Sequence, residues 1–182
     1  KAAHAGVAPE KGISAIRVAA LAVAKMPHGR IDAETTVNIG SFVGEGPNNV
    51  VRDHVRLVGE ARSRNSHKLQ QVLHDIEQAF LFAASATGAK AVFSWETMYD
   101  GFRFEADAPV RQMIESALQS EGFSPRPVES GGGSDANVFT AHGVPTINIG
   151  IGYEDIHSTN EHIRLSDIEK AARIAVAFCE FA

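Results

Sequence analysis

Two alternating segments set the architecture of the first half of the chain: T-V-N-I-G-S-F-V at residues 36–43 and V-R-D-H-V-R-L-V-G-E-A-R at residues 51–62. Apolar and polar side chains alternate along both, which is the period of a half-buried β-strand. Between them, G-E-G-P-N at residues 44–48 is rich in turn formers. The pattern therefore predicts a β-hairpin with a rather long loop.

Helical patterns lie on both sides of this hairpin. Residues 12–26 place apolar side chains at helical spacing until P-H-G interrupts them, and residues 66–85 do so again before Gly88. Residues 89–97 alternate once more and predict a further strand. The order helix, strand, strand, helix, strand predicts a ferredoxin-like α+β unit over residues 1–98, with its first strand missing or truncated.

The second half of the chain, residues 99–182, alternates helices with short apolar segments. Three helices are expected from the residues at their ends. Asp107 begins the first and Gly122 ends it, Ser134 and Asp135 begin the second, and Ser166 caps the third. Strands are expected at residues 127–129 and 145–150, and the second is apolar enough for a buried parallel sheet. These elements predict part of an α/β domain, because they are too few for a whole one.

Composition excludes several classes of protein. The 182 residues are 44% hydrophobic and carry a net charge of −5, with no block of Lys and Arg and no apolar run long enough for a bilayer. Neither a membrane nor a nucleic acid is therefore an expected partner. The single Cys179 excludes an intrachain disulfide framework, fits a cytoplasmic location, and is expected to be buried by the last helix. Because the chain opens with Lys1 and no leader pattern, we expect a piece of a longer polypeptide.

Two loops that precede helices carry candidate catalytic or binding residues. A-H-A-G-V-A-P-E at residues 3–10 places His4 where an imidazole can donate to a developing oxyanion, although this motif on its own favours an ordinary loop histidine. G-G-G-S-D-A-N at residues 131–137 can present backbone amides to a carboxylate, or serve as a structural turn. It matches neither a phosphate-binding P-loop nor a dinucleotide fingerprint.

A third motif, G-I-G-Y-E-D-I-H-S-T-N-E at residues 150–161, follows an apolar segment, where sites in open α/β sheets gather. His157, with carboxylates close by in sequence, is a candidate metal ligand. Its spacing to His162 does not match the helical H-E-x-x-H zinc site, and one histidine does not build a metal site. The residues alone therefore leave a metal site and a metal-free polar site both open.

Taken in order, the motifs resemble those of a known family. H-A-G-x-x-P-E-x-G, N-I-G with G-P-N-N-V-V and E-A-R-S, G-G-G-S-D-A-N, and G-x-G-Y-E-x-I-H-S-x-N-E are similar to the di-zinc exopeptidases related to peptidase T, carboxypeptidase G and the aminoacylases. The likeness is strongest to the peptidase T-like branch and runs over nearly the whole chain. It implies a ferredoxin-like lid that also dimerises, over residues 1–98, and the C-terminal part of a zinc-exopeptidase α/β catalytic domain over residues 99–182.

The resemblance also assigns roles to single residues. His157 matches a ligand of one of two zinc ions, and His4 matches a lid histidine that polarises the scissile carbonyl in the partner subunit's site. Asn49 and Arg62 match groups that hold substrate, Arg62 its carboxylate. The substrate pocket of the family is lined by the loop to which Ser134 and Asp135 correspond.

The implied function is zinc-dependent hydrolysis of short peptides from the amino end, by an aminopeptidase or tripeptidase that forms a homodimer through the lid. The family's other zinc ligands and its general-base glutamate have no match in this sequence, so the chain alone is expected to be inactive. Two alternatives stay open: an N-acyl amino acid amidohydrolase or carboxypeptidase of the same clan, and a non-catalytic homodimerisation module.

Overall fold

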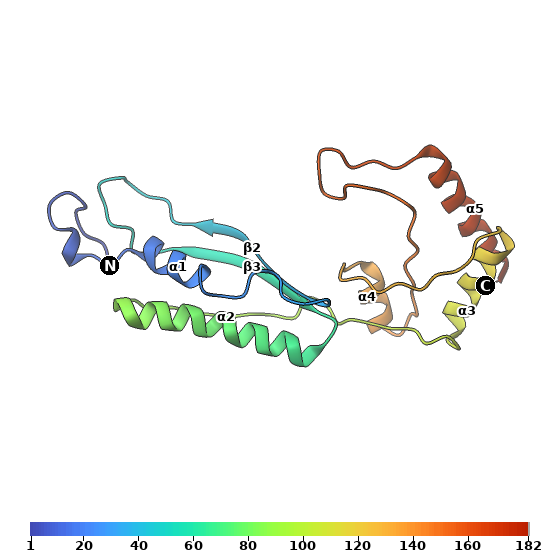
Figure 1. The fold of residues 1–182 in the computed structure, drawn as a ribbon, viewed down its shortest axis with the longest axis horizontal. Coiled ribbons are helices and arrows are strands. Elements are labelled where there is room, and N and C mark those ends of the chain that lie inside the picture. Colours follow the sequence, from blue (N-terminus) through green and yellow to red (C-terminus); the bar gives the residue numbers. More distant parts are fainter. Residues whose placement is uncertain (182) are drawn as a thin grey trace. The chain divides into compact units, whose positions relative to one another are not determined.

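The computed structural model describes residues 1–181 and divides the chain into two compact units. The first unit is Lys1–Glu96, and the second begins at Thr97 (Figure 1). Each unit has a cluster of buried apolar side chains of its own.

The first unit contains a three-stranded antiparallel sheet in the order β1-β2-β3. Its elements in chain order are η1 (Pro9–Lys11), α1 (Ala15–Val23), β1 (Gly29–Arg30), β2 (Thr35–Val43), β3 (Arg56–Ser63) and α2 (Ser66–Thr87). The expected hairpin is present: β2 and β3 pair with Thr36 opposite Arg62, and the register shifts between Ile39 and Ser41.

One face of this sheet is covered by helix. Met26, Val37, Val72 and Ile76 are buried together, and Ile39 packs against them. Val37 and Ile39 lie two apart on β2 and therefore share a face, while Val72 and Ile76 lie four apart on α2. Figure 1 shows α2 running alongside the hairpin.

Both ends of α2 follow from local chemistry. The side chain of Asn65 caps the first turn by accepting the backbone N–H groups of His67 and Lys68. Gly88, with a φ of 72°, ends the helix in the left-handed conformation that glycine adopts at least cost. The predicted stop at Gly88 is thus confirmed.

The expected strand at residues 89–97 is wrong. Phe93 does pack against the core of the first unit, whereas its neighbour Val92 is 84% exposed, so the alternation reflects one-sided packing. A strand also needs a neighbour to receive its backbone hydrogen bonds, and no described segment pairs with these residues. The short β1 was not predicted, and β3 begins five residues later than the alternation suggests.

Among the described residues of the second unit, the regular elements are three helices joined by long loops. Its elements are α3 (Pro109–Ser120), α4 (Asp135–Ala141) and α5 (Leu165–Phe181). Ile114 and Ala117 of α3 pack on Ile174 and Ala177 of α5. The described residues therefore combine helices with an antiparallel sheet, which is consistent with the expected fold class, an α/β fragment preceded by an α+β unit. Within residues 1–181 no helix has the length and apolar character to cross a membrane.

Several local expectations for the second unit are corrected. Neither residues 127–129 nor 145–150 form a strand, because no described segment pairs with their backbone in a ladder. Ala108, rather than Asp107, precedes α3, whose first residue is a proline. Ser166 lies inside α5 instead of capping it.

Cys179 is exposed rather than buried. The buried positions of α5 are Ile174 and Ala177, which lie three apart on one face. Cys179 follows Ala177 by two residues, or about 200° around the helix, and so points away from that face.

Candidate active site

His4 and Asn49 are brought together by backbone pairing. His4 forms an isolated antiparallel bridge with Val50, and the N–H of Ala5 donates to the carbonyl of Asn49 at 2.8 Å. The N–H of Gly6 donates to Nδ1 of His4 at 3.2 Å. An Nδ1 that accepts a hydrogen bond places the proton of the neutral ring on Nε2, which is therefore a donor. Both side chains are exposed to incoming groups.

Arg62 lies at the other end of the hairpin. It is the penultimate residue of β3, opposite Thr36, and its guanidinium pairs with Glu60 Oε2 at 2.8 Å. Arg62 lies six positions beyond the start of β3 at Arg56, which corresponds to roughly 20 Å of strand. The structure thus groups Asn49 with His4 and does not group either with Arg62 within this unit.

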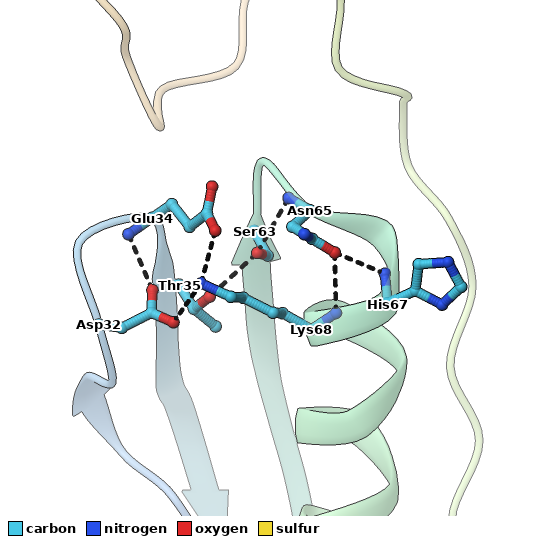
Figure 2. A network of polar contacts seen from close by, with 7 residues as sticks. All are labelled: Asp32, Glu34, Thr35, Ser63, Asn65, His67 and Lys68. Atoms are coloured by element: carbon cyan, nitrogen blue, oxygen red, sulfur yellow. Dashed lines mark hydrogen bonds and ion pairs between the residues drawn. The ribbon is translucent and has the colours of Figure 1, made fainter.

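A polar network fixes the turn that follows Arg62 (Figure 2). Nζ of Lys68 lies 2.9 Å from Asp32 Oδ2 and 2.6 Å from Glu34 Oε1, so one ammonium joins the two carboxylates that precede β2. The buried hydroxyl of Thr35 lies 3.0 Å from that of Ser63, the residue after Arg62. The network therefore ties the start of β2 to the end of β3 and the first turn of α2.

This network shifts the protonation of its charged members. The backbone N–H of Glu34 and the ammonium of Lys68 lower the pKa of Asp32 from 3.8 to about 2. The carboxylates of Glu34 and Asp32 raise the pKa of Lys68 above its usual 10.5. Sequence reasoning missed this arrangement; the only local signal was an Asn immediately before a helical pattern.

In the second unit, the glycine-rich loop enters α4 through Ser134. The N–H of Ser134 donates to Asn137 Oδ1 at 3.0 Å, and Asn148 Nδ2 donates to the hydroxyl of Ser134 at 2.8 Å. The N–H of Gly132 donates to the hydroxyl of Ser130. Two of the amides that could have formed an anion cradle are therefore already paired, while the side chain of Asp135 is exposed.

Tyr99 is a neighbour of this loop that the sequence did not reveal. A Cβ at Gly133 would collide with the ring and hydroxyl of Tyr99, so only glycine permits the ring to lie there. Asn137 Nδ2 also donates to the carbonyl of Asp100 at 2.8 Å. These contacts fasten the segment at residues 99–100 to the loop that precedes α4.

The loop of His157 has an unusual backbone. His157 has a φ of 65° and Asp155 a φ of 55°, both in the left-handed region. The backbone N–H of His157 donates to Glu161 Oε2 at 2.6 Å. Glu154 and His162 close the loop by an antiparallel bridge.

The described residues supply one candidate metal ligand and do not form a complete metal site. His157 offers an exposed imidazole on a held backbone, and imidazole is a common zinc ligand. Among residues 1–181, however, no group of three or more His, Cys, Asp or Glu side chains converges to hold an ion.

The family of the chain follows from comparison with known proteins. The profile of the peptidase family M20/M25/M40 matches residues 6–180, and the chain belongs to this family. It is similar to the structure of the aminopeptidase PepT from Bacillus cereus, with 47% identity, a TM-score of 0.80, and coverage of 100% of this chain and 48% of that one. A tripeptidase from Staphylococcus aureus gives 35% identity and a TM-score of 0.85, covering 98% and 48%. The resemblance to the peptidase T family is thereby confirmed.

Curated relatives extend the comparison. Uncharacterized protein YqjE of Bacillus subtilis is 44% identical over 180 residues, which are 99% of this chain and 48% of that protein. Peptidase T of Enterococcus faecalis is 24% identical, covering 99% and 44%. Succinyl-diaminopimelate desuccinylase of Nitratiruptor sp. is 26% identical, covering 93% and 47%. The chain spans about half the length of the curated relatives it matches.

Proposed function

We propose that this chain is part of a zinc-dependent exopeptidase that hydrolyses short peptides from their amino end. The observation that carries the proposal is the 47% identity to the aminopeptidase PepT across the full chain. The similarity to a tripeptidase at 35% identity supports short peptides as the substrate class. A cytoplasmic location remains the expectation from the sequence.

In this proposal His157 supplies one ligand to a pair of zinc ions. When bound, the zinc pair supplies Lewis acidity and an activated water. The described residues give one ligand, so the other ligands and the general base would come from outside this chain, and the chain by itself would be inactive. It would also bind zinc weakly, because zinc prefers about four ligands.

His4 is proposed to stabilise charge on the scissile carbonyl. The bond from the Gly6 N–H to Nδ1 makes Nε2 the donor, and a donor aimed at a developing oxyanion acts mainly in the transition state. Asn49 lies on the adjacent loop and would hold substrate. In a homodimer formed through the lid, residues 1–98, His4 would reach the partner subunit's site.

Arg62 is proposed to bind the carboxylate of the peptide. Its place near the end of strand β3 is supported by the Lys68 network, which limits the movement of the adjoining turn. A guanidinium can bind a carboxylate through two parallel hydrogen bonds. Ser134 and Asp135 would line the pocket from the loop before α4.

The proposal is tested with the full-length gene product that carries this sequence. After removal of metal with a chelator and reloading with zinc, we expect hydrolysis of tri-alanine and none of N-acetyl-tri-alanine, because a free amino end is required. The His157→Ala variant should lose both activity and stoichiometric zinc. The Glu169→Ala variant, altered at an exposed residue of α5, is the matched control.

The same assay separates the rival functions. The 26% identity to a succinyl-diaminopimelate desuccinylase favours an N-acyl amino acid amidohydrolase as the second candidate. Hydrolysis of N-acyl amino acids with no cleavage of free peptides would establish that rival. Dimers that hydrolyse neither substrate and hold no bound zinc would instead identify a non-catalytic homodimerisation module.

The homodimer has a test of its own. Full-length subunits carrying His4→Ala are mixed with subunits carrying His157→Ala, and heterodimers are isolated. If His4 acts in the partner's site, one site of each heterodimer carries both lesions and the other carries neither. Partial recovery of activity is expected, and its absence in verified heterodimers would show that His4 does not act across the dimer.

A further inference from the structure

The loop that carries His157 is closed and internally bonded. The backbone groups of Glu154 and His162 form two hydrogen bonds, at 2.9 and 3.2 Å. Within the loop, the N–H of Ser158 donates to the carbonyl of Asp155 at 3.0 Å. The N–H of Glu161 donates to the carbonyl of Ser158 at 3.3 Å. These bonds leave the segment between its two ends little conformational freedom.

The backbone of His157 has a conformation that is uncommon for any residue with a side chain. Among residues 1–181, the non-glycine residues with positive φ are Asp155 and His157, at 55° and 65°. In this region Cβ of an L residue crowds its own carbonyl, so surrounding contacts must maintain the conformation. Such strain is commonly located where a side chain has a function.

Glu161 supplies a contact that maintains it. Its Oε2 accepts the backbone N–H of His157 at 2.6 Å, and an ionised acceptor makes such a bond strong. The bond acts on the backbone of His157 and does not involve its imidazole. The carboxylate therefore orients the residue while leaving both ring nitrogens out of the bond.

We propose that Glu161 is a positioning residue, which holds the left-handed backbone of His157 and thereby fixes the direction from which the imidazole approaches zinc. The inference rests on the proposed function, in which His157 is a zinc ligand. Partners that orient a metal ligand typically change metal affinity by about 10–100-fold when they are removed. Here the orientation would act through a backbone amide rather than through the second ring nitrogen.

The first test reads the hydrogen bond directly. The full-length gene product is labelled with ¹⁵N-histidine, and the His157 amide signal is assigned by its loss in a His157→Gln variant. In Glu161→Ala we expect this signal to shift and its exchange with solvent to accelerate, because the acceptor is gone. Glu161→Gln keeps an acceptor oxygen and should retain a protected amide, and Glu169→Ala should change nothing.

The second test measures zinc affinity apart from activity. Metal-free full-length protein is titrated with Zn²⁺ against a chromogenic chelator. Glu161→Ala should raise the Kd of the site that depends on His157 by about 10–100-fold, and Glu161→Gln by much less. Glu161→Gln also separates positioning from misfolding, since it preserves the shape of the side chain.

The outcomes distinguish this inference from the proposed function. Normal zinc affinity in Glu161→Ala, with loss of zinc in His157→Ala, overturns the positioning role and leaves the proposed function intact. Normal zinc affinity in His157→Ala removes His157 from the proposed metal site, and an unprotected His157 amide in the wild-type protein removes the hydrogen bond itself.

Discussion

The N-terminal cap of α2 provides the most direct test of how the first unit is held together. Asn65 Oδ1 accepts two backbone N–H groups, from His67 at 3.0 Å and from Lys68 at 3.2 Å. Replacement of such a cap by alanine costs about 1 kcal/mol, within a range of about 0.5–2 kcal/mol, because those amides lose their acceptor. For a unit of the size of Lys1–Glu96, a loss of about 1 kcal/mol lowers the unfolding midpoint by about 4–8 °C.

The assay is thermal unfolding of wild-type, Asn65→Ala and Asn65→Asp proteins, followed by far-ultraviolet circular dichroism. Asn65→Asp keeps an acceptor at the same position and adds a negative charge at a helix N-terminus, so its midpoint should stay within a degree or two of the wild-type value, about the shift expected for a few tenths of a kcal/mol. His67→Ala removes the neighbouring side chain without touching the cap and serves as the matched control. An unchanged midpoint in Asn65→Ala, or an equal fall in Asn65→Asp, would refute the reasoning.

Three further predictions concern the proposed site and its support. His4→Ala in the full-length enzyme should lower kcat by about 10²–10³ with little change in KM, since a donor to an oxyanion acts in the transition state; steady-state kinetics that show a normal kcat would remove His4 from the mechanism. Arg62→Ala should raise KM for tripeptides more than it lowers kcat, because a group that binds a carboxylate also acts in the ground state, and an unchanged KM would contradict this role. The folded-state pKa of Asp32 is lowered, so its contribution to stability is present above pH 3.8 and is lost as the pH falls toward about 2. The pKa of Lys68 is raised, so its contribution is present below pH 10.5 and is lost at higher pH. In an Asp32→Asn variant, unfolding midpoints measured across pH should fall less than in the wild type, both at acid and at alkaline pH. A pH profile identical to that of the wild type would argue against the network.

The elements that the sequence predicts correctly are those that local chemistry determines. Alternation is enough to define β2, and Gly88 is enough to end α2, because each depends on residues close in the chain. The segments at 89–97 and 145–150 have equally suitable composition, yet a strand exists only beside another strand. No pattern within a segment reports whether that neighbour is present.

The same distinction between local sequence and distant contacts applies to the candidate site. The motifs identify His4 and His157 as residues of interest, since both lie in loops with distinctive composition. They do not reveal that His4 lies beside Asn49, because the hydrogen bond that brings the two loops together joins Ala5 and Asn49, which are 44 positions apart. The left-handed backbone of His157 has only a weak local signal, because histidine adopts this region more often than most residues with a side chain but still rarely.

The contact between Gly133 and Tyr99 has a consequence for how this sequence can change over evolutionary time. The end of the ring occupies the space that a Cβ at position 133 would need, so a side chain at 133 requires Tyr99 to move or to be replaced by a smaller residue. A homologue with alanine or serine at 133 should carry a residue smaller than tyrosine at 99, and one that keeps tyrosine should keep glycine. Across the family, a smaller residue at 99 should therefore accompany any larger residue at 133, and should precede it. The reverse order would pass through a protein in which the tyrosine ring and the new side chain overlap.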